Sequence, residues 1–151
     1  NITKKWDALC ANQNNGGAIV NVTDGTPGYH YQWSPADAGD VDSTGTLYGD
    51  KTYTITVTDA YNCKAITNVR VGQPNPMSIS VSTVPSGEIC ISQSAYIYAN
   101  PAGGTEPYRY NWDGTAANWS HDQGKIAFPS KDTTIYVNVI DTNGCTAMTT
   151  A

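Results

Sequence analysis

Three aspartates in one short segment are the densest set of potential metal ligands in the sequence. Asp37, Asp40 and Asp42 lie within Ser34–Ser43, beside Gly39. Calcium takes several carboxylate and carbonyl oxygens at one point, and a flexible glycine-containing loop can supply them. The spacing does not match the Asp-x-Asp-x-Asp-Gly loop with its distal Glu, so a solvated turn is favoured and a calcium site is the alternative.

Residue types used in catalysis occur without a catalytic spacing. Ser120, His121 and Asp122 carry the groups of a hydrolase triad, but three consecutive residues cannot converge on one reacting atom, so a solvated loop is favoured. His30 alternates away from its aromatic neighbours and is expected to be an exposed strand residue. The sequence contains no Gly-x-Ser-x-Gly motif, no His-Glu-x-x-His motif and no phosphate-binding glycine loop. It therefore predicts a protein that is not an enzyme and that has no cofactor other than the calcium alternative.

The four cysteines fall two into each half of the chain. Cys10 and Cys63 lie in the first half, and Cys90 and Cys145 lie at a similar spacing in the second. Of the three pairings that four cysteines allow, the one that repeats is favoured, Cys10 with Cys63 and Cys90 with Cys145. No Cys-x-x-Cys pair and no histidine close to a cysteine pair completes a tetrahedral zinc site. Disulfides need an oxidising compartment, which predicts a secreted or cell-surface protein.

Two segments of the first half recur in the second. Gly25–Trp33 recurs as Gly104–Trp112, and Tyr53–Cys63 recurs as Ile135–Cys145. Between the halves, Gln73–Pro76 contains two prolines, which remove backbone donors and cannot continue a central strand. The sequence therefore predicts two domains in tandem, residues 1–74 and 75–151, joined by a short and semi-rigid linker.

Alternating polar and apolar residues predict strands in both halves. The apolar residues Tyr53, Ile55 and Val57 share one face of a strand, and the threonines between them share the other. The same alternation sets Met77, Ile79 and Val81 against three serines. Turn-forming residues interrupt such runs about every eight to twelve positions, and no window predicts a helix. The predicted fold class is all-β, with antiparallel sheets packed as sandwiches.

Aromatic residues alternate once in each half. Tyr29, Tyr31 and Trp33 share one face of a predicted strand, and the pattern recurs at Tyr108, Tyr110 and Trp112. A buried core strand is favoured, and an exposed platform for sugar rings is the alternative.

One aspartate in each half precedes the second cysteine of that half. Asp59 and Asp141 stand at equivalent positions, four residues before Cys63 and Cys145. A carboxylate at such a position accepts hydrogen bonds from turn amides. We therefore predict that both aspartates cap their turns.

The charge of the chain limits the classes of partner. Its net charge is −5, with 13 acidic and 8 basic residues and no run of Lys or Arg, which argues against nucleic acid as a partner. The same balance argues against an anionic membrane surface. No apolar stretch of about 18 residues and no charged-then-apolar leader occurs, so we expect neither a membrane span nor an export signal within these residues.

Together these elements resemble the SprB-type repeats of Bacteroidetes cell-surface adhesins, relatives of the PKD-like and immunoglobulin-like sandwiches. The family turn Asp-x-x-Gly-Cys is intact at Asp141–Cys145, and in the first half Asn62 replaces its glycine. Asn also tolerates a left-handed backbone. Residues 113–125 are longer than the family pattern and contain Trp119, so the second half is closer to a general PKD-like domain. The matching residues of the first half are Cys10, Gly16–Val22, Gly25–Pro27, Tyr29, Tyr31, Trp33, Leu47, Tyr53–Asp59 and Cys63.

The resemblance implies two tandem immunoglobulin-like (PKD-like) sandwiches, each with one intradomain disulfide, in a secreted or surface-exposed array. We expect a non-catalytic structural or adhesive module of a gliding adhesin or an extracellular fibre. Its partners would be neighbouring repeats of the same or identical chains, surface glycans or other cells. The alternative is a carbohydrate-binding or accessory module of a secreted enzyme, with Trp6, Tyr96, Tyr98 and Trp119 as exposed stacking residues.

Each end of the chain lacks a segment that the other half contains. This predicts either an excerpt from a longer array or an exchange of terminal strands between molecules that builds a fibre. N-glycosylation sequons begin at Asn1, Asn21 and Asn118, and segments 42–44 and 132–134 resemble the O-glycosylation motif of Bacteroidetes exported proteins.

Overall fold

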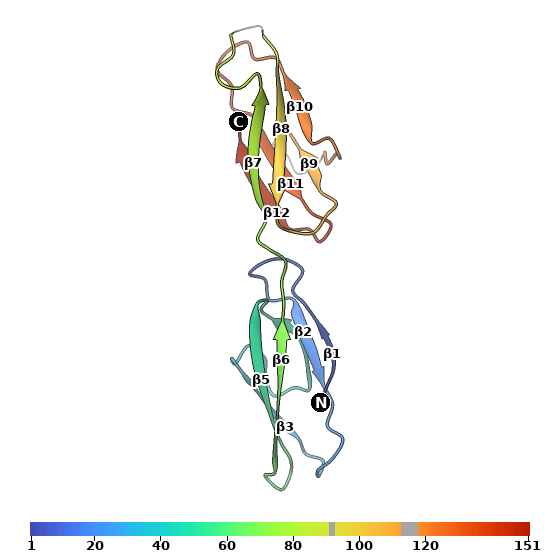
Figure 1. The fold of residues 1–151 in the computed structure, drawn as a ribbon. Coiled ribbons are helices and arrows are strands. Elements are labelled where there is room, and N and C mark those ends of the chain that lie inside the picture. Colours follow the sequence, from blue (N-terminus) through green and yellow to red (C-terminus); the bar gives the residue numbers. More distant parts are fainter. Residues whose placement is uncertain (91–92, 113–117) are drawn as a thin grey trace. The chain divides into compact units, whose positions relative to one another are not determined.

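The computed structural model describes residues 1–90, 93–112 and 118–151, which form strands and no helix (Figure 1). Contacts between Cα atoms divide the chain into two compact units, Asn1–Pro74 and Asn75–Ala151. The division falls within Gln73–Pro76, the segment in which the sequence places the domain boundary. Over the described residues, no helix is present that could cross a membrane.

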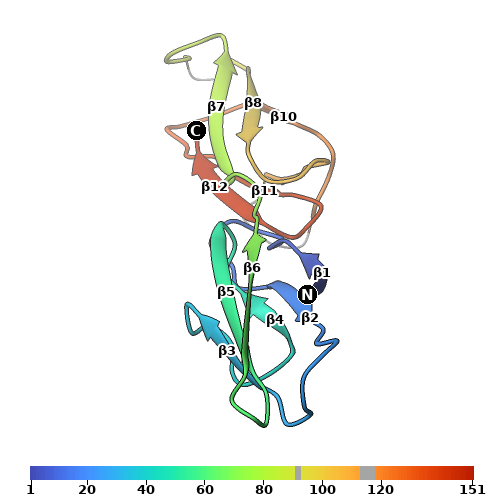
Figure 2. The same ribbon diagram turned by 60° about the horizontal axis from the view of Figure 1, so that its bottom comes forward.

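Unit 1 consists of two three-stranded antiparallel sheets. One sheet has the order β1-β2-β4 and the other has the order β3-β5-β6. In the immunoglobulin fold, strands A, B and E lie in one sheet and strands C, F and G in the other, and the six strands of unit 1 follow this arrangement. Figure 2 shows β5 and β6 as the longest pair of the unit. The strands are β1 (Ile2–Trp6), β2 (Gly16–Val20), β3 (His30–Ser34), β4 (Ser43–Leu47), β5 (Lys51–Thr58) and β6 (Lys64–Val71).

The core of unit 1 lies between its two sheets. Tyr53, Ile55 and Val57 of β5 are buried, as the alternation predicts, and the threonines between them are partly exposed. Alternate side chains of a strand point to the same face, so one strand can fill a core and meet solvent at the same time. From the opposite sheet, Ala18 and Leu47 complete the same buried cluster.

Unit 2 has the same strand order. When its strands are matched to those of unit 1 in chain order, the sheets β10-β8-β7 and β12-β11-β9 correspond to β4-β2-β1 and β6-β5-β3. Its core contains Ala99, Tyr110, Val137 and Val139, and the predicted inward residues of β7 pack against this cluster. The all-β antiparallel sandwich predicted from the sequence is confirmed. The strands are β7 (Ser78–Val84), β8 (Ala95–Ala102), β9 (Arg109–Asn111), β10 (Gly124–Ala127), β11 (Tyr136–Ile140) and β12 (Thr146–Thr150).

The predicted disulfide pairing is wrong. Cys63 and Cys90 are exposed free thiols, whereas Cys10 and Cys145 are disulfide-bonded. Neither the bond from Cys10 to Cys63 nor the bond from Cys90 to Cys145 is therefore formed. The sandwiches hold together without intradomain disulfides.

Strand length explains why the cysteines of unit 1 cannot pair. The Ala8 amide donates to the Gly72 carbonyl at 2.9 Å, which fixes the segment around Cys10 beside the last residues of β6. Cys63 directly precedes the first residue of β6. Eight residues of strand span roughly 26 Å, whereas a disulfide needs Cα atoms within about 7 Å.

The same geometry separates the cysteines of unit 2. Cys90 lies in the connection that leads into the first residue of β8. Cys145 lies in the turn after β11, and Asp141 of that turn accepts a hydrogen bond from the Thr105 amide, just beyond the last residue of β8. The length of β8 therefore lies between Cys90 and Cys145.

We predict that a maleimide reagent modifies Cys63 and Cys90 in the folded, unreduced protein and leaves Cys10 and Cys145 unmodified. Mass spectrometry of the intact protein and its peptides measures this directly. The variants Cys63→Ser and Cys90→Ser should each lose one label. Failure of Cys63 and Cys90 to react before reduction would contradict the assignment of these two residues as free thiols.

Candidate functional site

In unit 1, one aspartate joins the turn between β5 and β6 to a distant loop. Asp59 Oδ1 accepts hydrogen bonds from the amides of Tyr61 and Cys63 at 2.9 and 2.8 Å. Its Oδ2 accepts a hydrogen bond from the Thr26 amide at 3.1 Å. The Ala60 amide also donates to the Thr26 carbonyl at 3.3 Å, which adds a backbone link between turn and loop. We call this arrangement of Asp59, the turn amides and Thr26 the aspartate clamp of unit 1.

Unit 2 contains the same clamp around Asp141. Oδ1 accepts hydrogen bonds from the Asn143 and Cys145 amides, both at 2.8 Å, and Oδ2 accepts one from the Thr105 amide at 2.8 Å. The Thr142 amide donates to the Thr105 carbonyl at 3.2 Å. Asp141 is only 1% exposed, so its carboxylate needs these donors to compensate for lost water. The prediction that both aspartates cap their turns is confirmed.

Each clamp turn contains one residue with a left-handed backbone. Asn62 has φ of 64° and Gly144 has φ of 84°. Glycine adopts this conformation without a steric penalty, and Asn does so more readily than most other residues. The replacement of the family glycine by Asn62 therefore preserves the turn, as the sequence predicts.

The clamp lowers the pKa of the Asp59 carboxyl below its ordinary value. The hydrogen bond from the Thr26 amide is the largest cause, followed by the bond from the Cys63 amide, and partial desolvation opposes both. Because the folded pKa is depressed, the contribution of Asp59 to stability is complete above the pKa of the unfolded chain. It is lost as the pH falls through the folded pKa.

The three aspartates of the 34–43 segment have separate roles. Asp37 Oδ2 accepts a hydrogen bond from the Tyr53 hydroxyl at 2.7 Å and lies 3.3 Å from Lys51 Nζ. The Tyr53 bond is the largest cause of the lowered pKa of Asp37. Burial and, second, the same hydrogen bond raise the pKa of Tyr53 to about 12. Asp37 thus anchors the segment to a buried core tyrosine.

The other two aspartates do not join Asp37 in one site. Asp40 accepts a hydrogen bond from the Tyr31 amide and lies 2.7 Å from His30 Nδ1, and Asp42 uses its carbonyl to accept a bond from the Val20 amide. Among the described residues, no three or more His, Cys, Asp or Glu side chains gather closely enough to hold a metal ion. The carboxylates of Asp37, Asp40 and Asp42 are therefore not gathered at one point in this structure.

The residues that could suggest a hydrolase do not converge. Ser120 Oγ accepts a hydrogen bond from the backbone amide of Asp122 at 3.1 Å, and His121 and Asp122 are exposed. His30 is exposed on β3, as predicted, and the Asp40 carboxylate that it meets is also accessible to solvent. These contacts stabilise loops and do not assemble a nucleophile with its base.

The alternating aromatic residues belong to the cores. Trp33 is 2% exposed and its Nε1 donates to the Val41 carbonyl at 2.9 Å. Trp112 Nε1 donates to the Asp122 carbonyl at 3.0 Å. A buried tryptophan usually finds such an acceptor for its one polar atom. The core interpretation is confirmed over the sugar platform. The tyrosines of the two patterns are buried in the cores or packed against them: Tyr29, Tyr31, Tyr108 and Tyr110.

The four proposed stacking residues lie in different surroundings. Trp6 on β1 covers Gly17 of β2, and Lys4 Nζ lies 6.0 Å from the centre of its ring system. Trp119 is half-buried. Tyr96 and Tyr98 lie together on β8, with ring centroids 4.4 Å apart and planes tilted by 38°. The structure therefore pairs two of the four residues.

The threonine partners of the clamps are not among the residues predicted from the sequence. Thr26 and Thr105 follow glycines in the two recurring segments Gly25–Trp33 and Gly104–Trp112. The signal in the sequence was that the Gly-Thr pair and the turn aspartate both recur in the second half of the chain. The contact itself is non-local, and no spacing rule indicates which loop a turn carboxylate reaches.

Comparison with known protein families gives a match within unit 1. Residues 4–38 match the SprB repeat model, which confirms over these residues the resemblance inferred from the sequence. None of the curated proteins matches the chain. A solved structure of the C-terminal 282-residue fragment of intimin, in complex with the intimin-binding domain of the translocated intimin receptor, is similar with a TM-score of 0.49 and 14% identity. The match covers 100% of this chain and 63% of that one, so the chain spans less than two thirds of the fragment.

We predict that Asp141→Ala lowers the free energy of unfolding of unit 2 by about 3 kcal/mol, because three amides lose their acceptor. Asp132→Ala removes an exposed carboxylate from the same unit and should change this free energy by less than about 0.5 kcal/mol. Urea denaturation followed by amide NMR separates the two units. Equal effects of the two substitutions would contradict a structural role for the clamp.

Proposed function

We propose that the chain is a non-catalytic structural and adhesive module of a secreted or cell-surface repeat protein, in which each unit transmits tension between its two ends. A gliding adhesin or an extracellular fibre is the setting that we favour. The geometry of the first and last strand of each unit carries this proposal.

In unit 1 the chain enters and leaves at opposite ends of the sandwich. The Asn1 amino group donates to the Asn21 carbonyl at 2.9 Å, and Asn1 lies in a hollow that Ala65 and Ile66 of early β6 also line. At the other end, the Ala8 amide bonds Gly72 after the last residue of β6. The strands β1 and β6 contact each other and therefore run in the same direction.

Unit 2 repeats this arrangement. The Gly104 amide donates to the Asn75 carbonyl at 2.9 Å, so the chain enters beside the clamp loop. At the opposite end, Ala151 pairs with Ile135 through two backbone hydrogen bonds of 2.9 Å and lines a hollow together with Thr83 of late β7. The first and last strands, β7 and β12, contact each other. They too run in the same direction.

This geometry makes tension act as shear. Force applied at the two ends of a unit pulls its first and last strands in opposite directions along their own axes. Hydrogen bonds of antiparallel ladders lie perpendicular to the strands, so all the bonds of a terminal strand share the load. In unit 1, Lys5 Nζ also donates to the Arg70 carbonyl at 3.1 Å, and Asp7 Oδ1 accepts from the Gly72 amide at 2.7 Å. These bonds link β1 directly to the exit of the chain.

Other features support the same role. The SprB match over residues 4–38 fits a surface repeat protein, and the shared strand order of the two units fits a tandem repeat. The partners that we propose are neighbouring repeats of the same or identical chains, together with surface glycans or other cells. The acidic charge disfavours nucleic acid, and we propose neither enzymatic activity nor membrane insertion.

Single-molecule force spectroscopy tests the proposal with two pulling directions on one protein, in which serine replaces Cys10 and Cys145 so that no disulfide carries the load in place of the strands. In the first, handles are attached at Asn1 and Ala151. In the second, they are attached at Asn1 and at Cys63, in a Cys90→Ser background, so that β1 and β6 separate from one end and their bonds break in sequence. We predict that unit 1 unfolds at a clearly higher force in the first direction. Equal forces, or a lower force in the first direction, would contradict a role in bearing tension.

A further inference from the structure

The outer face of one sheet in unit 2 carries two neighbouring tyrosines. Along β8 the side chains of Ala95, Ile97 and Ala99 point into the core, so Tyr96 and Tyr98 point outward. Tyr98 is 37% exposed. An aromatic residue with its polar hydroxyl at the surface can contact an apolar ligand face and a polar ligand group together.

The two rings have a defined arrangement. Their centroids are 4.4 Å apart and their planes are tilted by 38°, so they pack against each other. Tyr96 also leans over Gly124 of β10, where any Cβ would collide with its ring. Gly124 lies opposite Tyr98 in the strand pairing. The absence of a side chain at Gly124 therefore makes room for the Tyr96 ring, and the packing holds the two rings without a ligand.

A hollow of about 540 Å³ opens beside this tyrosine pair. Ile126 of β10, 51% exposed, continues the apolar wall. The polar residues that line the hollow are His121, Asp122 and Gln123. Binding sites for small ligands commonly combine such apolar walls with a few polar groups that fix orientation.

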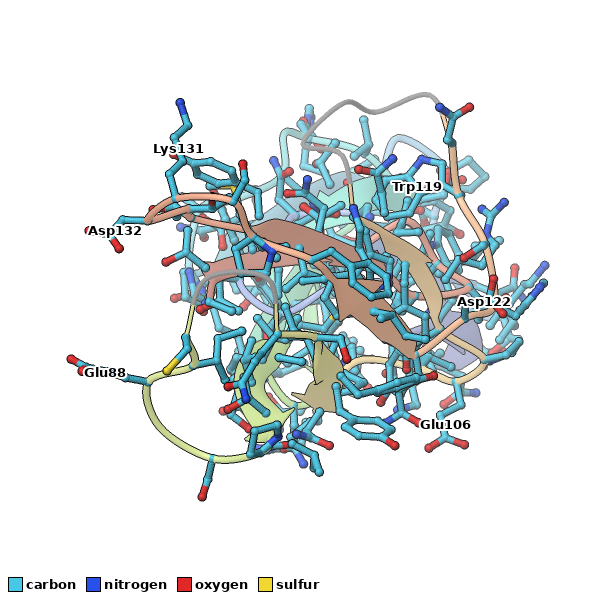
Figure 3. All side chains as sticks on the ribbon, turned by 90° about the horizontal axis from the view of Figure 1, so that it is seen from above. Glu88, Glu106, Trp119, Asp122, Lys131 and Asp132 are labelled. Atoms are coloured by element: carbon cyan, nitrogen blue, oxygen red, sulfur yellow. The ribbon has the colours of Figure 1, made fainter. Side chains whose placement is uncertain are left out.

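These polar residues combine one fixed group with two groups that face solvent. Gln123 Nε2 donates to the Ala99 carbonyl at 2.9 Å, which holds its side chain against the sheet. The backbone of Asp122 is also fixed, because its carbonyl accepts a hydrogen bond from Trp112 Nε1. Within the described part of the chain, the His121 ring and the Asp122 carboxylate make no hydrogen bond. Figure 3 shows Asp122 at the periphery, on the side away from Glu88 and Asp132.

The tyrosine pair is specific to unit 2. Trp6 is the last residue of β1 and pairs with Gly17, and Val84 is the last residue of β7 and pairs with Tyr96. Gly17 and Ile19 of unit 1 therefore correspond to Tyr96 and Tyr98 of unit 2. In unit 1, Trp6 lies over Gly17 and covers this part of the sheet. The sandwich therefore does not need two tyrosines here, which separates the pair from the requirements of the fold.

We propose that the hollow beside Tyr96 and Tyr98 binds a neutral pyranose unit of a glycan. The face of a pyranose that carries C–H groups would contact the exposed ring of Tyr98, because the electron-rich face of an aromatic ring attracts such groups. Sugar hydroxyls would donate to the Asp122 carboxylate and exchange hydrogen bonds with His121. The inference rests on the proposed adhesive role, in which surface glycans are partners, and it is independent of the tension-bearing role, because a unit can bind a sugar whether or not it resists force.

Charge favours a neutral sugar over an acidic one. Among the residues that the structure describes, those that line the hollow include Asp122 with its carboxylate and neither Lys nor Arg. The chain as a whole carries a net charge of −5. A uronate or sulfate group would therefore meet like charge and no cation to bind it. Trp119, the other stacking candidate of unit 2, does not line this hollow.

NMR titration of the 151-residue protein tests the proposal. The probes are cellohexaose, laminarihexaose, a β-1,4-linked galactohexaose and, as the acidic control, a hexamer of guluronic acid. We expect at least one neutral hexamer to shift the signals of Tyr96, Tyr98 and residues 121–126 in a saturable way. Tyr98→Ala should weaken this binding by about tenfold, the effect of losing one aromatic contact. The acidic hexamer should bind more weakly than the neutral one.

Tyr136→Ala is the matched control, since Tyr136 is 51% exposed on the other sheet of the same unit. It should leave affinity within about twofold of the parent protein, and Tyr98→Phe should retain most of the binding because it keeps the ring. The proposal is overturned if no neutral hexamer shifts these signals up to about 10 mM, if the shifts map elsewhere, or if Tyr136→Ala weakens binding as much as Tyr98→Ala. The parent titration decides the matter even if Tyr98→Ala fails to fold.

Discussion

The aspartate clamp is the interaction on which each sandwich depends most. The amides of a tight turn at the end of two strands have no partner in the sheet, and buried amides without an acceptor destabilise a fold. A single carboxylate supplies the missing acceptors. One of its oxygens accepts hydrogen bonds from two turn amides, and the other accepts one from the amide of a loop far away in the chain. In this way Asp59 and Asp141 fix where the last two strands of each unit meet the loop that leads to the third strand, β3 in unit 1 and β9 in unit 2.

The clamps also relate the fold to the proposed function. In unit 2 the clamp loop lies where the chain enters, since the residue before the clamp threonine, Gly104, bonds Asn75. Tension that arrives there passes into strands whose hydrogen bonds lie across the direction of pull. The outward-facing side chains of the sheets do not take part in these hydrogen bonds. In unit 1, Trp6 covers the outer face of the sheet that contains β2, whereas in unit 2 the corresponding face, on β8, presents a tyrosine pair and a hollow. The two units therefore share a framework and differ in what they present to solvent.

Most of the framework could be predicted from the sequence because it depends on local periodicity. The alternation in Tyr53–Thr58 specified the buried face of β5, and the recurring Asp before each second cysteine indicated a capped turn. Non-local contacts could not be predicted in this way. Asp37 accepts a hydrogen bond from the core residue Tyr53, and Asp40 accepts one from the backbone of β3, so residues that are close in sequence have different partners. The cysteine pairing failed for a related reason. Equal spacing suggested a repeated bond, but in each unit a full strand separates the two cysteines.

The most direct test of this account is an NMR pH titration of the amide signals of Thr26, Tyr61 and Cys63 in the folded protein. All three amides donate to Asp59, whose pKa the clamp holds below the ordinary value of 3.8. The account predicts that the three signals move together through one transition with a midpoint below 3.8. Independent movement of the signals, or a common midpoint at or above that value, would contradict it.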